Sequence, residues 1–155
     1  PVEGLSPGDQ WESVEFLRIP ALRGTDLPSV RSLNMEVEYI SDVEMSGKPV
    51  RLVRSSGELW LNELGVKVED ILPEEEIKKV NTLNYKFYDE RGGKILFKKE
   101  QWIDSATGIV VRAKNQTRLI AWIEDVRKPV GNTVALKDND MIVSLAHIVE
   151  FKLKN

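Results

Sequence analysis

The sequence predicts a mainly β protein, a β-rich α+β domain in which a curved antiparallel sheet or half-barrel carries one or two short helices. From residue 33 onward, apolar and polar residues alternate with a period of two over long runs, as in strands with one buried face. Short segments rich in glycine, asparagine, aspartate and serine separate these runs, which is typical of hairpin connections. Only residues 73–80 have a clear helical pattern.

Composition limits the class of protein. The length of 155 residues fits one domain, which we assign to residues 1–155. Hydrophobic residues make up 41% and charged residues 30%, too apolar for a disordered chain and too charged for an integral membrane protein. The formal net charge of −3 is spread along the chain, so we expect no nucleic-acid partner. No apolar run could span a bilayer, so we expect a soluble body without a transmembrane segment.

The first half of the chain is expected to form an edge strand that begins at residues 8–11 and ends before Pro20, and strands at residues 33–45, 50–54 and 59–61. For the first of these, a helix with Trp11 on its apolar stripe is an alternative. Gly47 is typical of a hairpin turn and lies between the strands predicted at residues 33–45 and 50–54. Residues 55–58, which include Gly57, predict a break before the fourth. Val66 and Val68 then form one more short alternating stretch.

The expected helix at residues 73–80 has proline in its first turn, then Glu74, Glu75 and Glu76, then two lysines, as the helix dipole favours. The glutamates are adjacent on one helix start, whereas catalytic carboxylate pairs face each other across a cleft. We therefore interpret them as a solvated cluster. A helix this short depends on the sheet for support, so we place it against the concave face.

The second half is expected to form strands at residues 83–89, 95–103, 109–114, 119–123, 134–136, 142–145 and 149–153. Gly92 and Gly93 can adopt the positive φ angles of a tight hairpin between the first two. Gly108 fits the left-handed position of the next turn. Residues 115–117 and 137–140 are polar and predict an interruption and a turn, respectively.

No catalytic, metal or cofactor motif is assembled in the sequence, so we expect no enzyme, no metal site and no cofactor. The chain has no cysteine, which excludes disulfides, thiolate metal sites and thiol nucleophiles. His147, the only histidine, stands in an apolar run, and no nucleophile elbow accompanies it. Residues 138–140 look like the start of a calcium loop, but Val143 and Val149 stand where the loop needs glycine and glutamate.

Large aromatic side chains are the candidate ligand contacts. Trp60, Tyr88, Trp102 and Trp122 are predicted to line the concave face of the sheet, because amphipathic rings dominate contact energies. Core packing is the alternative role for such residues. Asn115 begins an Asn-x-Thr acceptor sequence at a predicted turn and is a candidate glycosylation site if the protein is secreted.

One hairpin resembles a known family. The run Trp102-Ile103-Asp104-Ser105-Ala106-Thr107-Gly108 is similar to a hairpin of LolA-like and related envelope lipoprotein domains of bacteria and archaea. Residues 7–11 resemble the start of several surface lipoprotein domains just after their anchor. The resemblance implies an antiparallel half-barrel that holds a lipid or other apolar cargo, sometimes tethered to a membrane. It transfers no functional residue, because the matched positions shape a turn.

These observations predict a non-catalytic, extracytoplasmic or cell-envelope domain that binds an apolar small molecule or a protein partner on its concave face. The first alternative is a structural or interaction module of a larger surface protein, without a ligand. A long exposed edge strand favours that alternative, because edges recruit partner strands. A carboxylate-based hydrolase is the third hypothesis. The chain begins with Pro1 and not with methionine, so we expect a processed product or a piece of a longer protein.

Overall fold

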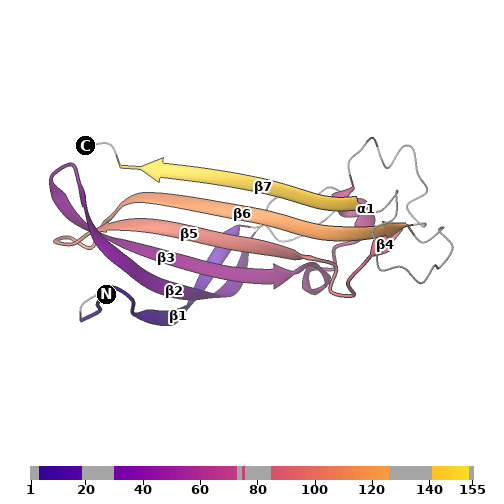
Figure 1. Ribbon diagram of the computed structural model, residues 1–155, viewed down its shortest axis with the longest axis horizontal. Helices are drawn as coiled ribbons and strands as arrows, with labels where there is room; N and C mark the ends of the chain where they lie inside the picture. The colour runs from indigo at the N-terminus through magenta and orange to yellow at the C-terminus, as the bar shows by residue number, and fades with distance from the viewer. Residues whose placement is uncertain (1–3, 19–29, 73–74, 76–84, 126–140, 154–155) are drawn as a thin grey trace.

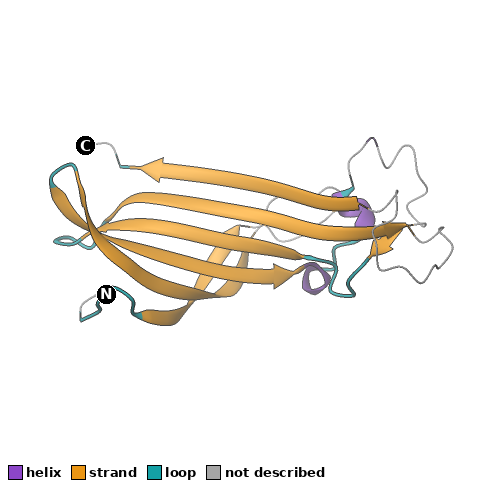
Figure 2. Ribbon diagram, viewed as in Figure 1, coloured by secondary structure: helices purple, strands orange, loops and turns teal. Residues whose placement is uncertain are grey.

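In a computed structural model of the protein, the described residues form one seven-stranded antiparallel sheet (Figures 1 and 2). The structure describes residues 4–18, 30–72, 75, 85–125 and 141–153. Its strands are β1 (Gln10–Arg18), β2 (Val30–Met45), β3 (Lys48–Trp60), β4 (Tyr85–Phe87), β5 (Lys94–Asp104), β6 (Val110–Asp125) and β7 (Met141–Lys152). The prediction of a mainly β, curved antiparallel sheet with short helical elements is confirmed, and the sheet is not closed into a barrel.

Apart from β4, the strands follow one another as a meander with β1 and β7 at its two margins (Figure 1). β4 and β5 both pair with β6, at Phe87↔Ile123 and Lys94↔Ile120 respectively. The predicted tight hairpin between these two strands is therefore wrong, although Gly92 and Gly93 do have positive φ angles of 81° and 94°. The glycine turn instead passes close over β6, where a Cβ on Gly93 would lie 2.4 Å from the Ile120 carbonyl oxygen.

The sheet curls because β2 leaves β3 part-way along. Residues 30–38 of β2 pair with β1, and residues 36–45 pair with β3, so the two ranges barely overlap. Gly57 of β3 marks the departure point, since a Cβ there would lie 2.5 Å from Met35 Sδ and 3.1 Å from the Asn34 carbonyl oxygen. The first part of β2 passes behind the central strands in Figure 1. A glycine is needed where one strand crosses so close to another.

The curl gives the sheet a concave and an outer face. Lys99 Nζ of β5 donates to Glu15 Oε2 of β1 at 2.8 Å, although two strands lie between them in the sheet. The side chains that face across the curl are therefore those on the side of Glu15 and Lys99. By register and alternation, the concave face is formed by odd-numbered residues of β1 up to Glu15, of β2 from Arg31 to Tyr39, of β3 and β5, of β6 from Ala113 to Ile123 and of β7 from Val149. Even-numbered residues of these segments form the outer face.

The hydrophobic core lies on the concave face, includes Met35 and Val37 of β2 and Val53 of β3, and is covered by helical segments at one end. Ile95, Leu119 and Ile123 from the sheet pack there against two short helical segments, the 3-10 helix η1 (Leu61–Leu64) and the helix α1 (Val68–Ile71). The segments lie at the end of the sheet where β3 stops and β5 begins (Figure 2). Both belong to one connection, and their buried side chains are Leu61, Leu64, Val66, Val68, Ile71 and Leu72.

Several predicted boundaries are wrong. β3 continues through residues 55–58, because β5 pairs with all four and β2 pairs with residues 55 and 56. β6 continues through residues 115–117, because β5 and β7 pair with them on both sides. β7 is one strand, with no gap between residues 145 and 149. Val68 begins a helix, because its spacing to the buried Ile71 and Leu72 is helical and Asp70 Oδ2 accepts the Lys67 N–H at 2.8 Å.

Other predictions are confirmed or lie outside the described residues. β1 is a strand, as expected, and Gly108 has a left-handed φ of 71° in the turn before β6. Of the helix predicted at residues 73–80, only Glu75 is described, and it is helical and exposed. The strand predicted at residues 134–136 and the turn at 137–140 lie outside the described residues. Among the residues described, no helix has the length and apolar character needed to cross a bilayer.

Candidate functional site

The four aromatic residues predicted to line the concave face lie elsewhere. Trp60, Trp102 and Trp122 are even-numbered residues of β3, β5 and β6 and belong to the outer face. Tyr88 stacks on Trp122 with ring centroids 4.2 Å apart and an angle of 9° between the rings. The prediction of a shared concave lining is therefore wrong in its placement, and the structure distributes these rings along the outer face.

Cationic side chains cover two of these rings. Arg91 Cζ lies 3.8 Å from the Trp60 ring centroid, and Arg112 Cζ lies 4.5 Å from that of Trp102. Lys94 Nζ also lies 5.4 Å from the Trp60 centroid, so two cations share that ring. Such contacts attract a cation to the electron-rich ring face and shield the ring from water. Both indole rings thus have contacts within the chain.

Asn115, the candidate glycosylation site, does not lie in a turn. It is in the middle of β6 and pairs with Lys99 of β5 on one side and with Val149 of β7 on the other. Its side chain is exposed on the concave face. The predicted turn is wrong because residues 115–117 pair with β5 on one side and with β7 on the other, so the strand continues through them. Whether Asn115 is modified stays a prediction.

The centre of the concave face is polar and charged. The side chains of Glu15 and Lys99, joined at 2.8 Å, are 16% and 24% exposed. Ser55 is almost fully buried beside them on β3, and Thr117 follows on β6. The apolar end of the same face is filled by η1 and α1. In the described part of the chain, the Glu15–Lys99 ion pair and Ser55 thus lie among buried apolar residues of the concave face, which include Val37 and Val53.

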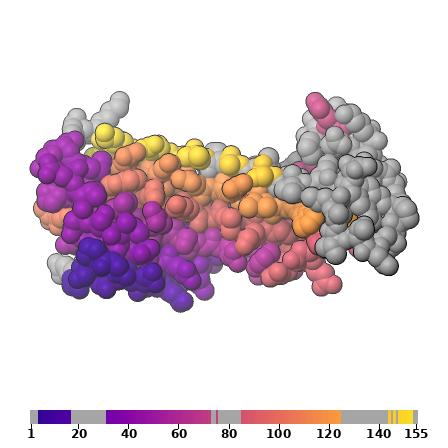
Figure 3. All heavy atoms as spheres, viewed as in Figure 1, coloured from indigo at the N-terminus to yellow at the C-terminus, as the bar shows by residue number. Residues whose placement is uncertain are grey.

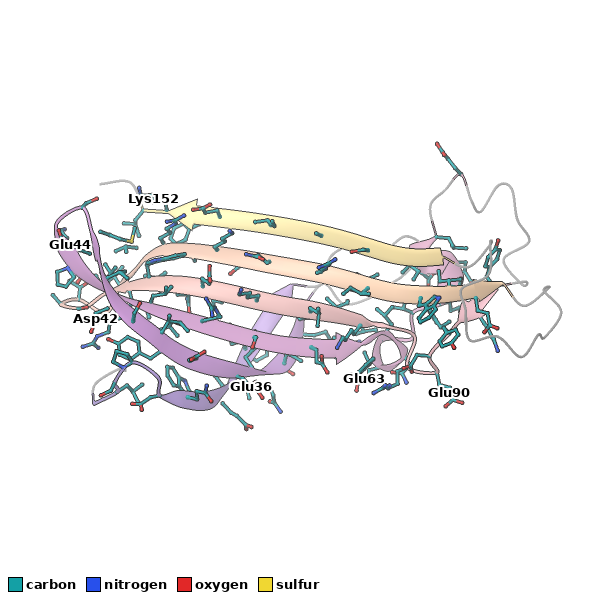
Figure 4. All side chains as sticks on the ribbon, viewed as in Figure 1. Glu36, Asp42, Glu44, Glu63, Glu90 and Lys152 are labelled. Atoms are coloured by element: carbon teal, nitrogen blue, oxygen red, sulfur yellow. The ribbon has the colours of Figure 1, made fainter. Side chains whose placement is uncertain are left out.

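Two shallow hollows lie on the outer face. One, of about 330 Å³, lies over β1, β2 and the neighbouring part of β3, and the other, of about 520 Å³, extends it toward β5. They share Glu36 and Ser56, and Glu36 projects from the margin of the molecule in Figure 4. Glu12 and Glu36 are directly opposite each other on β1 and β2, an arrangement that disfavours strand pairing through like-charge repulsion. The hollows are open, so they resemble grooves between strands more than ligand cavities.

The outer edge of β7 is the feature that the sequence did not predict. The Leu153 N–H donates to the Val111 carbonyl oxygen at 2.9 Å, and the register with β6 continues without a shift to Met141. Because backbone groups alternate in direction along a strand, odd-numbered residues of β7 bond to β6. The N–H and C=O groups of Ile148, Glu150 and Lys152 therefore point away from the sheet. No described strand pairs with them.

Apolar side chains flank this edge. The exposed fractions are 60% for Ile148, 47% for Val149, 48% for Phe151 and 46% for Leu153. Val149, Phe151 and Leu153 share the concave side, whereas Ile148 lies on the outer face. In Figure 3 the strand runs along one long margin of the molecule. An edge strand that carries several exposed apolar residues is a template for pairing with another chain.

The opposite margin, β1, also exposes apolar residues but is anchored by its charged contact. Phe16 and Val14 are 78% and 62% exposed on the outer face. Glu15, between them, reaches across the concave face to Lys99. β1 is therefore held in the curl by a side-chain contact, whereas β7 pairs with β6 alone among the described strands.

Perturbed ionisable groups have local causes. Burial, with the hydrogen bond that Tyr39 donates to Asp42, raises the pKa of the Tyr39 phenol. Backbone N–H groups of Thr107 and Ala106 donate to Asp104 and lower its pKa in the hairpin that resembles the envelope family. These groups are in separate places and form no shared pocket. The described residues contain no group of three potential metal ligands, and the side chain of His147 is outside the description.

Comparisons with known proteins found no match for this chain, whether among family models, curated proteins or solved structures. The resemblance of residues 102–108 to LolA-like domains therefore stays a prediction. What the structure adds is the role of those residues, since Asp104 and Gly108 shape the turn itself.

Proposed function

We propose that this domain is a non-catalytic interaction module that takes up an extended segment of a protein partner along the free edge of β7. We also propose an extracytoplasmic or cell-envelope location, which the resemblance of residues 102–108 supports. The observation that carries the function is the unpaired edge of β7 with its half-exposed apolar side chains. Of the alternatives that the sequence left open, this one fits the geometry best.

Strand addition uses both the outward backbone groups and the apolar side chains of this edge. The outward backbone groups of Ile148, Glu150 and Lys152 can bond to an extended segment, and side-chain contacts then give specificity. Val149 and Phe151 would contact alternate side chains of the incoming segment on the concave side.

An apolar small molecule is less well supported. A lipid in the middle of the concave face would meet the Glu15–Lys99 ion pair, and separating or dehydrating that pair opposes binding. At the other end of the face, Leu61 and Ile71 already occupy the space over Ile95. An extended protein segment at the β7 edge would leave the ion pair and these apolar side chains in place.

The test uses a single backbone donor. Ile148→Pro removes one outward N–H and leaves the bonds to β6 in place, and proline is tolerated on an edge strand. Extended peptides selected from a random library on the natural chain serve as probes, with affinity measured by fluorescence anisotropy. We expect binding to weaken about tenfold or more, because a buried carbonyl of the peptide loses its donor.

The matched control is Ile148→Thr, which changes the side chain and keeps the N–H. We expect this variant to bind the same peptides within a few-fold of the natural chain. Equal binding by Ile148→Pro and the natural chain would show that the peptides dock elsewhere and would overturn the proposal.

A further inference from the structure

The side chains at the end of β7 have a pattern of apolar and charged residues that is symmetric about Phe151. From Val149 to Leu153 the sequence is apolar, acidic, apolar, basic, apolar, and Phe151 is at its centre. Reversing this segment about Phe151 exchanges Glu150 with Lys152 and leaves the apolar positions apolar. An antiparallel pairing of two identical strands imposes this reversal, because a two-fold axis brings residues before the axis against residues after it.

The directions of the backbone N–H and C=O groups also fit a two-fold axis at Phe151. The outward N–H and C=O groups belong to Glu150 and Lys152, so a two-fold axis at Phe151 makes these two residues a hydrogen-bonded pair across the interface. Phe151 then meets Phe151 of the second copy as a non-hydrogen-bonded pair, the kind in which side chains approach most closely. Val149 lies opposite Leu153 of the second copy.

We propose that the partner at the β7 edge is a second copy of this chain, paired antiparallel about Phe151 so that the sheet continues from one copy into the other. This inference deepens the proposed function and rests on it. Glu150 of each copy lies opposite Lys152 of the other on the outer face. Phe151, Val149 and Leu153, each about half exposed in the single chain, become one continuous apolar row on the concave side.

The contacts that Glu150 and Lys152 make within one chain are compatible with this pairing. Glu150 Oε1 accepts the Arg112 Nε–H at 2.7 Å, which leaves its second oxygen available. Lys152 is directly opposite Arg112 on β6, a like-charge pair, and the described residues provide no carboxylate for it. Lys152 projects at the end of β7 in Figure 4. A carboxylate from a second copy would relieve the repulsion.

Another axis on the same strand matches less well. With the axis at Ile148, Glu150 would face Ala146, and Lys152 would face Ser144, so neither charge would find an opposite charge. Charge complementarity therefore selects Phe151 among the axes available in the described part of β7.

The experiment is a charge exchange read by sedimentation velocity over a hundredfold range of concentration. The natural chain is expected to show a monomer–dimer equilibrium. Glu150→Lys places two lysines opposite each other, and Lys152→Glu places two glutamates opposite each other, so each alone should raise the dimer dissociation constant at least tenfold. The double variant Glu150→Lys/Lys152→Glu restores opposite charges and should return to within a few-fold of the natural value.

Ala146→Lys is the matched control. It adds a charge on the same face of β7, outside the paired segment, and should leave the dimer unchanged. Circular dichroism checks that each variant is folded. A monomer at all concentrations, a dimer indifferent to both single changes, or a double variant no better than the single ones would each overturn self-pairing. If self-pairing fails while Ile148→Pro still abolishes peptide binding, the proposed function stands with another partner.

Discussion

Replacing Gly93 with alanine is expected to lower the free energy of unfolding by about 3 kcal/mol or more, because strain and overlap add. Gly93 has a φ of 94°, which an alanine adopts only with strain. Its added Cβ would lie 2.4 Å from the Ile120 carbonyl oxygen and 2.8 Å from the Ala121 Cα. Both are backbone atoms of β6, so no side-chain rotation relieves the overlap. Urea unfolding followed by circular dichroism measures the change.

Gly108→Ala is the control for Gly93→Ala. Gly108 also has a positive φ, 71°, but a Cβ there would meet nothing within 4 Å. Only the conformational strain remains, so we expect a loss of about 1–2 kcal/mol. Equal losses at the two positions would mean that the turn at Gly93 does not pass over β6 as the structure shows.

Leu61→Ala is expected to destabilise the protein by about 2–5 kcal/mol, the range for deleting a buried leucine side chain. Leu61 is fully buried in η1, and its N–H donates to the Gly93 carbonyl oxygen at 3.0 Å. The variant leaves a cavity between η1 and the end of the sheet. Urea unfolding again provides the measurement.

Glu63→Ala tests the same 3-10 helix on its exposed side. Because Glu63 is exposed, we expect a change within about 0.5 kcal/mol. A similar small effect at Leu61 would contradict the placement of η1 over the apolar end of the concave face.

Much of the sheet could be predicted from the sequence, because alternation is a local property of a strand with one buried face. Residues 33–39 alternate clearly and lie in β2. The errors fall where polar or small residues are inside a strand. Gly57 has the signature of a break, but it accommodates the crossing of β2, and only the neighbouring strand reveals that role.

The short helix α1 was missed for a related reason. Val66 and Val68 alternate, and both are buried, so the pattern fits a strand as well as the end of a turn. The decisive spacing is from Val68 to Ile71 and Leu72, three and four residues apart. With Asp70 at the start of the helix, this spacing could have indicated it.

The candidate site was the least predictable feature. A period of two shows which residues share a face, but it does not show toward which face the sheet curls, so Trp60 and Trp102 were assigned to the wrong side. Edge position is also invisible in the sequence, because it depends on the order of strands. In the sequence, the exposed apolar residues of β7 have the pattern of an ordinary half-buried strand. Only the structure shows that β7 is an edge strand, because β6 is the one described strand that pairs with it.

The free edge of β7 is tested most directly by amide hydrogen exchange, residue by residue, on dilute protein. Amides of Val149, Phe151 and Leu153 bond to β6 and are expected to exchange slowly, whereas those of Ile148, Glu150 and Lys152 should exchange much faster. At high concentration the second set should become protected. Equal protection of both sets in dilute solution would mean that another part of the chain already covers this edge, and would contradict the account.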